Sequence, residues 1–355
     1  MRVMVCAGGT GGGIYPALAA VAEMRRQGLA EDDLLWLGAQ GEMEETLVPR
    51  AGLRLATIPA GPIVGIPLRA RARNVARMAR GCFAALGHVR RFRPSVLFMT
   101  GGYVAAPVAV AARSRGVPIV IYLPDVEPGS TIRFAVPLAR RIACTSDGSR
   151  AFVPAQKMVV TGYPVRPEIR AARQLSREEA LARFELRPGR PTLFVFGGSR
   201  GAQAINRALM SWPEVEANAA TLPAELRASY RPYPYLHEEM GPAFRAADLV
   251  VARAGASMLG ECPAFGLPSL LVPLTFAWRY QKVNADYLTE RGAAVQLTDE
   301  TLPEALLPTV RALLFAPDRL AGMAAAAAAL DRPTAAADLA RLILAQRADD
   351  AREEG

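Results

Sequence analysis

Short runs of apolar residues alternate along the chain with longer stretches in which apolar positions recur every three or four residues. In the first half the apolar runs lie at residues 3–7, 34–38, 96–102, 117–122, 140–146 and 157–165. The pattern then starts again, with apolar runs that begin at residues 191, 248, 268 and 293. Short strands that alternate with helices form parallel sheets covered by helices. The chain is therefore predicted to be an α/β protein made of two similar halves.

Each half begins with a strand that runs into a glycine-rich loop and then into a helical pattern. The first loop reads GGTGGG at residues 8–13, before a helix predicted over 16–27, and the second reads FGGSRGAQ at 196–203. Glycine loses more backbone freedom on folding than any other residue, so five glycines in six positions need a physical reason. At a helix N-terminus such a loop directs backbone N–H groups toward an anion such as a diphosphate. A tight turn that packs a strand against a helix is the structural alternative.

Two further glycine turns follow predicted strands, MTGGYVAAP at 99–107 and VARAGASMLGE at 251–261. Glu261 lies near the start of a helix, where two carboxylate oxygens suit the adjacent hydroxyls of a sugar. Stabilisation of the helix N-terminus by its charge is the alternative. The first loop lacks both the GK[ST] of a Walker loop and the GxGxxG pattern with a following acid, which disfavours nicotinamide binding.

The polar stretch over 164–190 contains no buried strand and is interpreted as a linker with one helix. We expect an N-terminal domain over 1–163 and a C-terminal domain over 191–345, each with a Rossmann-like parallel sheet. The two domains would face each other across a cleft, because ligands of such sheets bind at the carboxyl ends of the strands. The last helix is a candidate to pack back on the N-terminal domain.

Composition narrows the class of protein. A chain of 355 residues with 51% hydrophobic content supports two packed cores, and it has no 18-residue uncharged apolar run that would predict a transmembrane helix. The four cysteines form no CxxC pattern, which indicates free thiols in a reducing compartment. Only two histidines are present, so a histidine-rich metal site is excluded.

The net charge of +9 is concentrated in the first half, where no acidic residue but twelve arginines lie between Glu45 and Asp125. This excess predicts an anionic partner. Eight arginines fall within residues 62–94, together with apolar residues that we expect to be exposed, namely Ile63, Val64, Ile66, Leu68 and Phe83. Such a mixture is typical of a protein that rests on an anionic membrane surface. An amphipathic helix packed on the sheet with its arginines in water is the alternative, and no motif or aromatic enrichment favours nucleic acid.

Several motifs in this order resemble the MurG family, namely GGTGGGIYPAL, TGGYVAAP, GYPVR, FGGSRGAQAIN, RAGASMLGE, GLPSLLVPL and WRYQKVNADYL. The resemblance covers roughly residues 1–345 and implies a GT-B fold and an inverting, metal-independent glycosyltransferase without a cofactor. The implied reaction is transfer of N-acetylglucosamine from UDP-N-acetylglucosamine to undecaprenyl-diphospho-N-acetylmuramoyl-pentapeptide, in peptidoglycan precursor synthesis. The family acts at the cytoplasmic face of the cell membrane, with the acceptor on the N-terminal domain and the UDP-sugar on the C-terminal domain.

The resemblance also implies roles for individual residues. On the acceptor side these are Thr10, Gly11 and Gly12, which would lie against the acceptor diphosphate and the donor sugar, and Gly101 and Gly102, which would hold the acceptor diphosphate. On the donor side, Arg166 and Ser199 would contact the diphosphate of UDP, Gln281 would bind the sugar hydroxyls and Asn284 would support that loop. The uridine and ribose would lie against Ala256, Ser257, Met258, Leu259, Gly260 and Glu261, with Glu261 on the ribose hydroxyls.

The chain departs from the family at the candidate general base. Where the family has a histidine at the end of the first glycine loop, this sequence has Gly13. Transfer still needs a proton acceptor, and general-base catalysis is typically worth about 10²–10⁴-fold. Asp125 is the candidate that we prefer, with Glu127 as its neighbour in YLPDVEPGS. An unassisted hydroxyl is a further possibility.

A second departure is length, because the stretch near 210–228 lacks the apolar strand that the family has there. This loss is expected to weaken donor binding or stability. His237, in YLHEEM, falls where the family contacts uracil through its backbone, and an exposed loop histidine is the alternative. Two other functions stay open: a non-catalytic protein that binds lipid diphosphates or nucleotide sugars, and another GT-B enzyme such as a glycolipid synthase or a nucleotide-sugar 2-epimerase.

Overall fold

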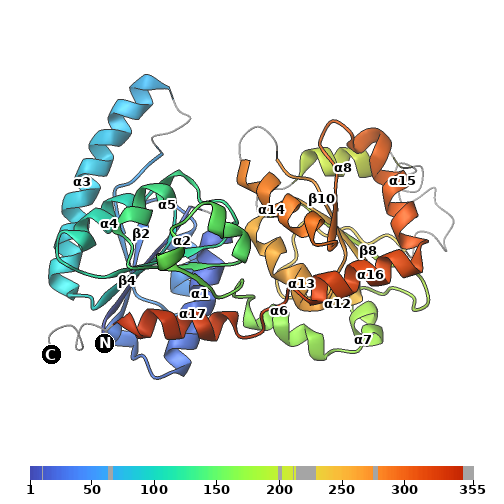
Figure 1. Cartoon of the computed structure of the whole chain (residues 1–355), viewed down its shortest axis with the longest axis horizontal. Helices are drawn as coiled ribbons and strands as arrows, with labels where there is room; N and C mark the ends of the chain where they lie inside the picture. The colour runs from blue at the N-terminus through green and yellow to red at the C-terminus, as the bar shows by residue number, and fades with distance from the viewer. Residues whose placement is uncertain are drawn as a thin grey trace. The chain divides into compact units, whose positions relative to one another are not determined.

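The computed structural model describes residues 1–9, 11–62, 67–198, 202–210, 212, 229–274 and 279–346. It divides into two units, Met1–Pro164 with Thr334–Gly355 and Val165–Pro333 (Figure 1). Several residues singled out above lie outside the described residues, namely Thr10, Ile63, Val64, Ile66, Ser199 and most of the shortened stretch, 211 and 213–228.

The first unit is built on a seven-stranded sheet in the order β3-β2-β1-β4-β5-β6-β7, with every pair parallel. Its strands are β1 (Val3–Ala7), β2 (Leu34–Ala39), β3 (Leu55–Ile58), β4 (Val96–Gly101), β5 (Ile119–Leu123), β6 (Arg141–Cys144) and β7 (Met158–Val160). Strands β1, β4 and β5 are buried along their whole length, which explains their nearly uninterrupted apolar sequence. The chain order reverses between β1 and β4, and ligands of such sheets bind at this point.

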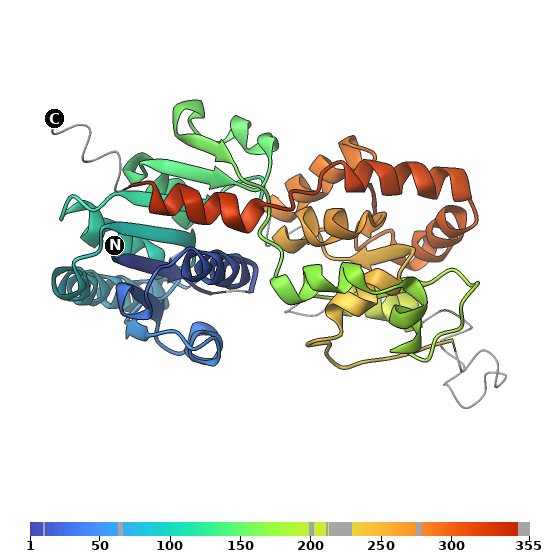
Figure 2. The same ribbon diagram turned by 90° about the horizontal axis from the view of Figure 1, so that it is seen from below.

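Helices cover both faces of this sheet. The helices of the first unit are α1 (Gly11–Arg26), α2 (Glu44–Arg50), α3 (Leu68–Phe92), α4 (Ala105–Arg113), α5 (Ser130–Ala135) and α17 (Ala335–Leu344), with 3₁₀ turns at Glu31–Asp33, Val136–Leu138, Asp147–Ala151 and Ala155–Lys157. On one face, α3 and α4 pack Ala85 and Val108 against Leu97 of β4. On the other face, α1 and α17 lie against each other (Figure 2), and Val21 of α1 and Leu339 of α17 belong to one core. The last helix of the chain therefore completes the first unit rather than the second.

Helix α1 begins at Gly11, five residues earlier than the pattern of apolar residues predicts. Glycine carries no apolar signal, so the periodicity could not place this helical turn. The first turn of α1 therefore consists of Gly11, Gly12 and Gly13, and the leading backbone N–H groups of a helix have no partner within it.

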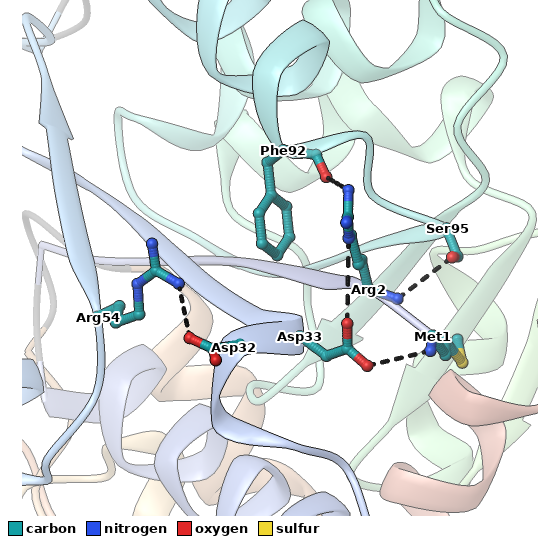
Figure 3. Close-up of polar contacts among 7 residues, drawn as sticks. All are labelled: Met1, Arg2, Asp32, Asp33, Arg54, Phe92 and Ser95. Carbon is teal, nitrogen blue, oxygen red and sulfur yellow. Dashed lines mark hydrogen bonds and ion pairs between the residues drawn. The ribbon is translucent and has the colours of Figure 1, made fainter.

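Contacts at the amino ends of the strands close that edge of the first sheet (Figure 3). The terminal amine of Met1 lies 3.2 Å from Oδ2 of Asp33, and the Arg2 guanidinium donates a 3.0 Å hydrogen bond to the carbonyl of Phe92. The backbone N–H of Arg2 donates to the hydroxyl of Ser95 over 3.3 Å. These interactions join β1 to its neighbours away from the carboxyl edge, where the glycine turns lie.

The second unit is built on a parallel sheet in the order β11-β10-β9-β8 among its described residues. Its strands are β8 (Leu193–Phe196), β9 (Leu249–Ala252), β10 (Ser269–Leu271) and β11 (Ala294–Gln296). Its helices are α6 (Pro167–Ala171), α7 (Arg177–Ala182), α8 (Gln203–Met210), α12 (Met240–Ala246), α13 (Glu261–Phe265), α14 (Arg279–Glu290), α15 (Leu302–Leu314) and α16 (Pro317–Ala328), with 3₁₀ turns at Ala172–Gln174 and Ala256–Leu259. The residues of β8 are only half-buried, in contrast with the buried β9.

The prediction of a linker with one helix over 164–190 was wrong, because the segment holds two short helices and belongs from Val165 onward to the second unit. Pro167 occupies the first turn of α6, where the missing N–H costs nothing. A capping box then starts α7, since Ser176 accepts from the N–H of Glu179 while the Glu179 carboxylate accepts from the N–H of Ser176. Leu181 of α7 joins Ala243 of α12 in a small core, so this segment is packed rather than a free connection.

None of the helices in the described part of the chain is long and apolar enough to cross a membrane.

Candidate active site

The two glycine turns of the first unit meet backbone to backbone. They follow β1 and β4, which are neighbours in the sheet. A Cβ atom on Gly102 would lie 2.6 Å from the carbonyl oxygen of Gly8, and one on Gly9 would lie 3.7 Å from Cα of Gly102. Gly9, Gly101 and Gly102 have φ angles of +84°, +119° and +85°, which only glycine adopts freely. Glycine is therefore required in these turns for both space and conformation. The contact leaves backbone N–H and C=O groups of both turns near the point between β1 and β4 where the strand order reverses.

Position 13 lies directly against the end of β4. The Thr100 hydroxyl donates a 3.0 Å hydrogen bond to the carbonyl of Gly13. A Cβ atom on Gly13 would lie 3.0 Å from Oγ1 of Thr100 and 3.8 Å from the carbonyl oxygen of Gly8. A larger side chain at this position would thus start beside both glycine turns and would require Thr100 to move by a few tenths of an ångström.

The half-exposed Asp125 lies in the loop after β5, which is the sheet neighbour of β4. The hydroxyl of Thr145 donates a 2.8 Å hydrogen bond to the carbonyl of Pro124, and the hydroxyl of Ser149 donates a 2.9 Å hydrogen bond to the carbonyl of Val126. The backbone is therefore held on both sides of Asp125. Such bracing keeps a carboxylate in a defined position at the carboxyl edge of the sheet.

The carboxylate of Glu127, two residues after Asp125, lies in a different environment. Glu127 is buried and forms an ion pair with the guanidinium of Arg133, which also donates a 2.9 Å hydrogen bond to the carbonyl of Pro128. Glu127 is thus enclosed in the fold, whereas Asp125 is partly exposed at the carboxyl edge of the sheet, where a substrate could reach it.

In the second unit, the structure brings together two residues that lie far apart in the sequence. Arg166, just before α6, places Nη2 3.8 Å from Oε1 of Glu261, whose side chain is only 7% exposed. Burial raises the pKa of Glu261 to about 7, while Arg166 and a hydrogen bond from Ser257 oppose this rise and the charge of Glu168 adds to it. The site therefore holds a carboxyl group that titrates near neutral pH beside a permanent cation.

Helix α14 braces the loop between β9 and α13. The fully buried Asn284 donates a 3.1 Å hydrogen bond from Nδ2 to the carbonyl of Ala254. One turn earlier, Oε1 of Gln281 accepts a 3.1 Å hydrogen bond from the N–H of Leu274. Both residues that the family resemblance singled out on this helix thus contact loops at the carboxyl edge of the second sheet.

The sequence motifs assigned no role to Arg253 of the second unit or to Glu44 of the first unit. The side chain of Arg253 is buried at the end of β9, where Nη1 donates to Oδ1 of Asp299 over 2.6 Å and to the carbonyl of Val272 over 3.2 Å. It thereby joins the ends of neighbouring strands. A lone arginine in the small-residue sequence VARAG was the available signal for a buried ion pair at this strand end.

His237 is exposed, with its ring centroid 4.4 Å from that of Tyr235.

Within the described ranges, no group of three or more His, Cys, Asp and Glu residues is placed to hold a metal ion. All four cysteines are free.

Two units that each carry a parallel sheet, together with the matches below, define the chain as a glycosyltransferase with the GT-B fold. The chain matches the Glycosyltransferase family 28 N-terminal domain over residues 3–144 and the Glycosyltransferase family 28 C-terminal domain over residues 217–339. It belongs to the MurG family of glycosyltransferases within this class.

Three similar proteins support this assignment. The UDP-N-acetylglucosamine--N-acetylmuramyl-(pentapeptide) pyrophosphoryl-undecaprenol N-acetylglucosamine transferase of Desulforudis audaxviator is 39% identical, over 94% of this chain and 95% of the relative. The protein of the same name from Roseiflexus sp. is 36% identical, over 97% of this chain and 94% of the relative. The crystal structure of Acinetobacter baumannii MurG superposes with a TM-score of 0.76 at 26% identity, over 97% and 99% of the two chains. The predicted family and GT-B fold are thus confirmed.

Proposed function

We propose that the chain transfers N-acetylglucosamine from UDP-N-acetylglucosamine to undecaprenyl-diphospho-N-acetylmuramoyl-pentapeptide. The observation that carries this proposal is the pairing of Arg166 with the buried Glu261 at the loop that follows β9. Arginine binds phosphate through a planar two-pronged fork, and a carboxylate accepts hydrogen bonds from two adjacent hydroxyls. Side by side, these groups suit the diphosphate and the ribose of one UDP molecule.

The donor half of the reaction then follows from the residues of the second unit. Arg166 neutralises charge that develops on the departing UDP, so that the protein rather than a metal ion stabilises the leaving group. Gln281 binds hydroxyls of the sugar, and Asn284 keeps the supporting loop in place. The acceptor hydroxyl attacks the anomeric carbon from the side opposite UDP, which inverts the configuration at that carbon.

The acceptor half relies on the first unit. The first turn of α1 and the turn at Gly101 and Gly102 offer backbone N–H groups to the acceptor diphosphate. Because Gly13 supplies no imidazole, Asp125 accepts the proton of the acceptor hydroxyl as the bond to the sugar forms. The bracing of the backbone around Asp125 supports this role, since a general base must be held within hydrogen-bond reach of its proton.

The test is UDP release by the purified protein, given UDP-N-acetylglucosamine and a short-chain analogue of the lipid-linked acceptor. We expect release that depends on the acceptor, and a loss of about 10²–10⁴-fold in kcat for Asp125→Asn. Asp147→Asn is the matched control, because Asp147 is an exposed acid at the start of the 3₁₀ turn that follows the neighbouring strand β6. UDP binding without release would instead identify a binding protein, and conversion of the donor without acceptor would identify an epimerase.

We further propose that the first unit rests on the anionic cytoplasmic surface of the cell membrane. Phe83 on α3 is 78% exposed, and Val75 on α3, Val110 on α4 and Phe134 on α5 are also exposed. Helix α4 contacts both α3 and α5 on one side of the sheet (Figure 1). The surrounding sequence from 46 to 124 contains twelve arginines and no acid. Inserted apolar groups and roughly 1 kcal/mol per basic residue near the surface would together hold the protein there.

Flotation of the protein with vesicles tests this membrane proposal. We expect binding to vesicles that contain phosphatidylglycerol, weak binding to neutral phosphatidylcholine, and weakened binding for Phe83→Ser. Phe315→Ser is the control, since Phe315 in the second unit is 75% exposed and matches Phe83 in exposure. Equal binding by the two variants would contradict the proposed surface.

A further inference from the structure

A fully buried carboxylate lies behind the first glycine loop. Glu44, the first residue of α2, is 0% exposed. Its Oε1 accepts a 2.9 Å hydrogen bond from the N–H of Ala39 at the end of β2, and its Oε2 accepts a 3.3 Å hydrogen bond from the N–H of Gly9. A carboxylate buried with backbone partners is costly to remove, because each N–H would lose its acceptor in a dry environment.

Two glycines make room for this side chain. A Cβ atom on Gly8 would lie 2.3 Å from Oε1 of Glu44, and one on Gly38 would lie 2.6 Å from its Cγ. Real Cβ atoms do not approach other atoms this closely, so both positions exclude larger residues while Glu44 is in place. The glycine at position 8 of the GGTGGG loop therefore makes room for the carboxylate of Glu44 rather than for a ligand.

The hydrogen bond to Gly9 also sets the direction of a backbone carbonyl. In a trans peptide the N–H and the preceding C=O point in opposite directions. Because the N–H of Gly9 points to Glu44, the carbonyl of Gly8 points away from it. Consistent with this, the carbonyl oxygen of Gly8 lies 2.6 Å from the Cβ position of Gly102 and 3.8 Å from that of Gly13. Glu44 thus fixes the direction of the Gly8 carbonyl, which lies between the first turn of α1 and the second glycine turn.

We propose that Glu44 is a positioning residue for the transfer reaction, one that holds the Gly8–Gly9 peptide in the orientation that the acceptor requires. The inference rests on the glycine loop lying against the acceptor, as in the function proposed above. Glu44 itself touches no substrate, because it is sealed behind the loop. Its effect should therefore fall on the acceptor and leave the binding of UDP, which is assigned to residues of the second unit, unaffected.

The first test compares Glu44→Gln with Glu45→Gln, since Glu45 is the next residue of α2 and is exposed. A glutamine keeps the size of the side chain but turns one acceptor into an NH₂ group that faces an N–H donor. In Glu44→Gln we expect kcat/KM for the acceptor analogue to fall by about tenfold to a hundredfold, the loss that misplacement of about 1 Å can cause. The thermal shift caused by UDP should stay at the value of the parent protein, as should every parameter of Glu45→Gln.

Hydrogen exchange of the substrate-free protein supplies a readout that does not depend on the reaction. Amides of the peptide over 8–13 should exchange faster in Glu44→Gln than in Glu45→Gln. Unchanged exchange would overturn the inference, and so would faster exchange with unchanged acceptor kinetics. Absence of acceptor-dependent UDP release in the parent protein would instead refute the proposed function, while the exchange experiment would still test the contact between Glu44 and the loop.

A second pair of variants keeps the inference falsifiable if Glu44→Gln does not fold. Gly8→Ala pushes a methyl group into the carboxylate and should reduce kcat/KM for the acceptor. Adding Glu44→Asp, whose side chain is one methylene shorter, should restore part of the loss because the space is regained. A Gly8→Ala variant with normal acceptor kinetics, or a double variant with no recovery, would overturn the inference.

Discussion

Glu261 should destabilise the free protein at neutral and alkaline pH, and its replacement by glutamine should reverse this effect. The pKa of this buried carboxyl is raised from 4.5 to about 7, chiefly by burial. The folded state therefore holds a proton that the unfolded state releases. Stability contributed by this proton is present below pH 4.5 and is lost as the pH rises to about 7.

The size of the effect follows from the same pKa values. Each pKa unit corresponds to 1.36 kcal/mol, so a rise from 4.5 to about 7 corresponds to roughly 3 kcal/mol between pH 4.5 and pH 8. Glu261→Gln stays neutral at every pH and escapes this loss. At about 2–4 °C per kcal/mol for a unit of this size, the variant should gain roughly 5–10 °C in Tm relative to the parent protein between pH 5 and pH 8.

The effect of Glu261→Gln on UDP binding should be opposite to its effect on stability. The ionised carboxylate is the better acceptor for two ribose hydroxyls, so UDP should bind more tightly above pH 7 and should release a proton when it binds below pH 7. Glu261→Gln should lose most of the UDP-induced rise in Tm and its dependence on pH. The variant would thus be more stable and less able to bind donor.

The assay is thermal unfolding at pH 5 and pH 8, with and without UDP, for the parent protein, for Glu261→Gln and for Glu304→Gln as a variant at an exposed carboxyl of the same unit. The difference in Tm between Glu261→Gln and the parent protein should grow from pH 5 to pH 8. A difference that is constant with pH, or a variant that is less stable at pH 8 than at pH 5 by as much as the parent protein, would refute the reasoning.

Two further predictions concern the two halves of the reaction. Gly13→His should raise kcat and add a dependence on pH near the ordinary histidine pKa of about 6.5, although crowding against Thr100 should lower stability; a pH–rate profile with no new ionisation would contradict a role for this position in proton transfer. Asn284→Ala should weaken UDP binding, because the carbonyl of Ala254 loses a buried hydrogen bond worth about 1–3 kcal/mol, and calorimetry with UDP alone should detect it; unchanged affinity would show that the loop holds its shape without this bond.

The sequence by itself determined the local features of this protein. The local sequence is enough to predict strands such as Val3–Ala7 and Val96–Gly101 and the glycine turns that follow them. An apolar run or a glycine determines the conformation of its own part of the backbone. The repeat of this pattern after residue 190 predicted two parallel sheets, and the motifs predicted the family. The periodicity missed the first turn of α1, since Gly11–Gly13 carry no apolar signal.

The tertiary structure alone decided which distant residues act together. The contact between Arg166 and Glu261 and the hydrogen bond from Gly9 to Glu44 join segments far apart in the chain. Periodicity cannot reveal such contacts, because it reports which face of an element is buried and not what buries it. The pKa of Glu261 is the clearest case, since it is raised by burial that only the folded protein creates.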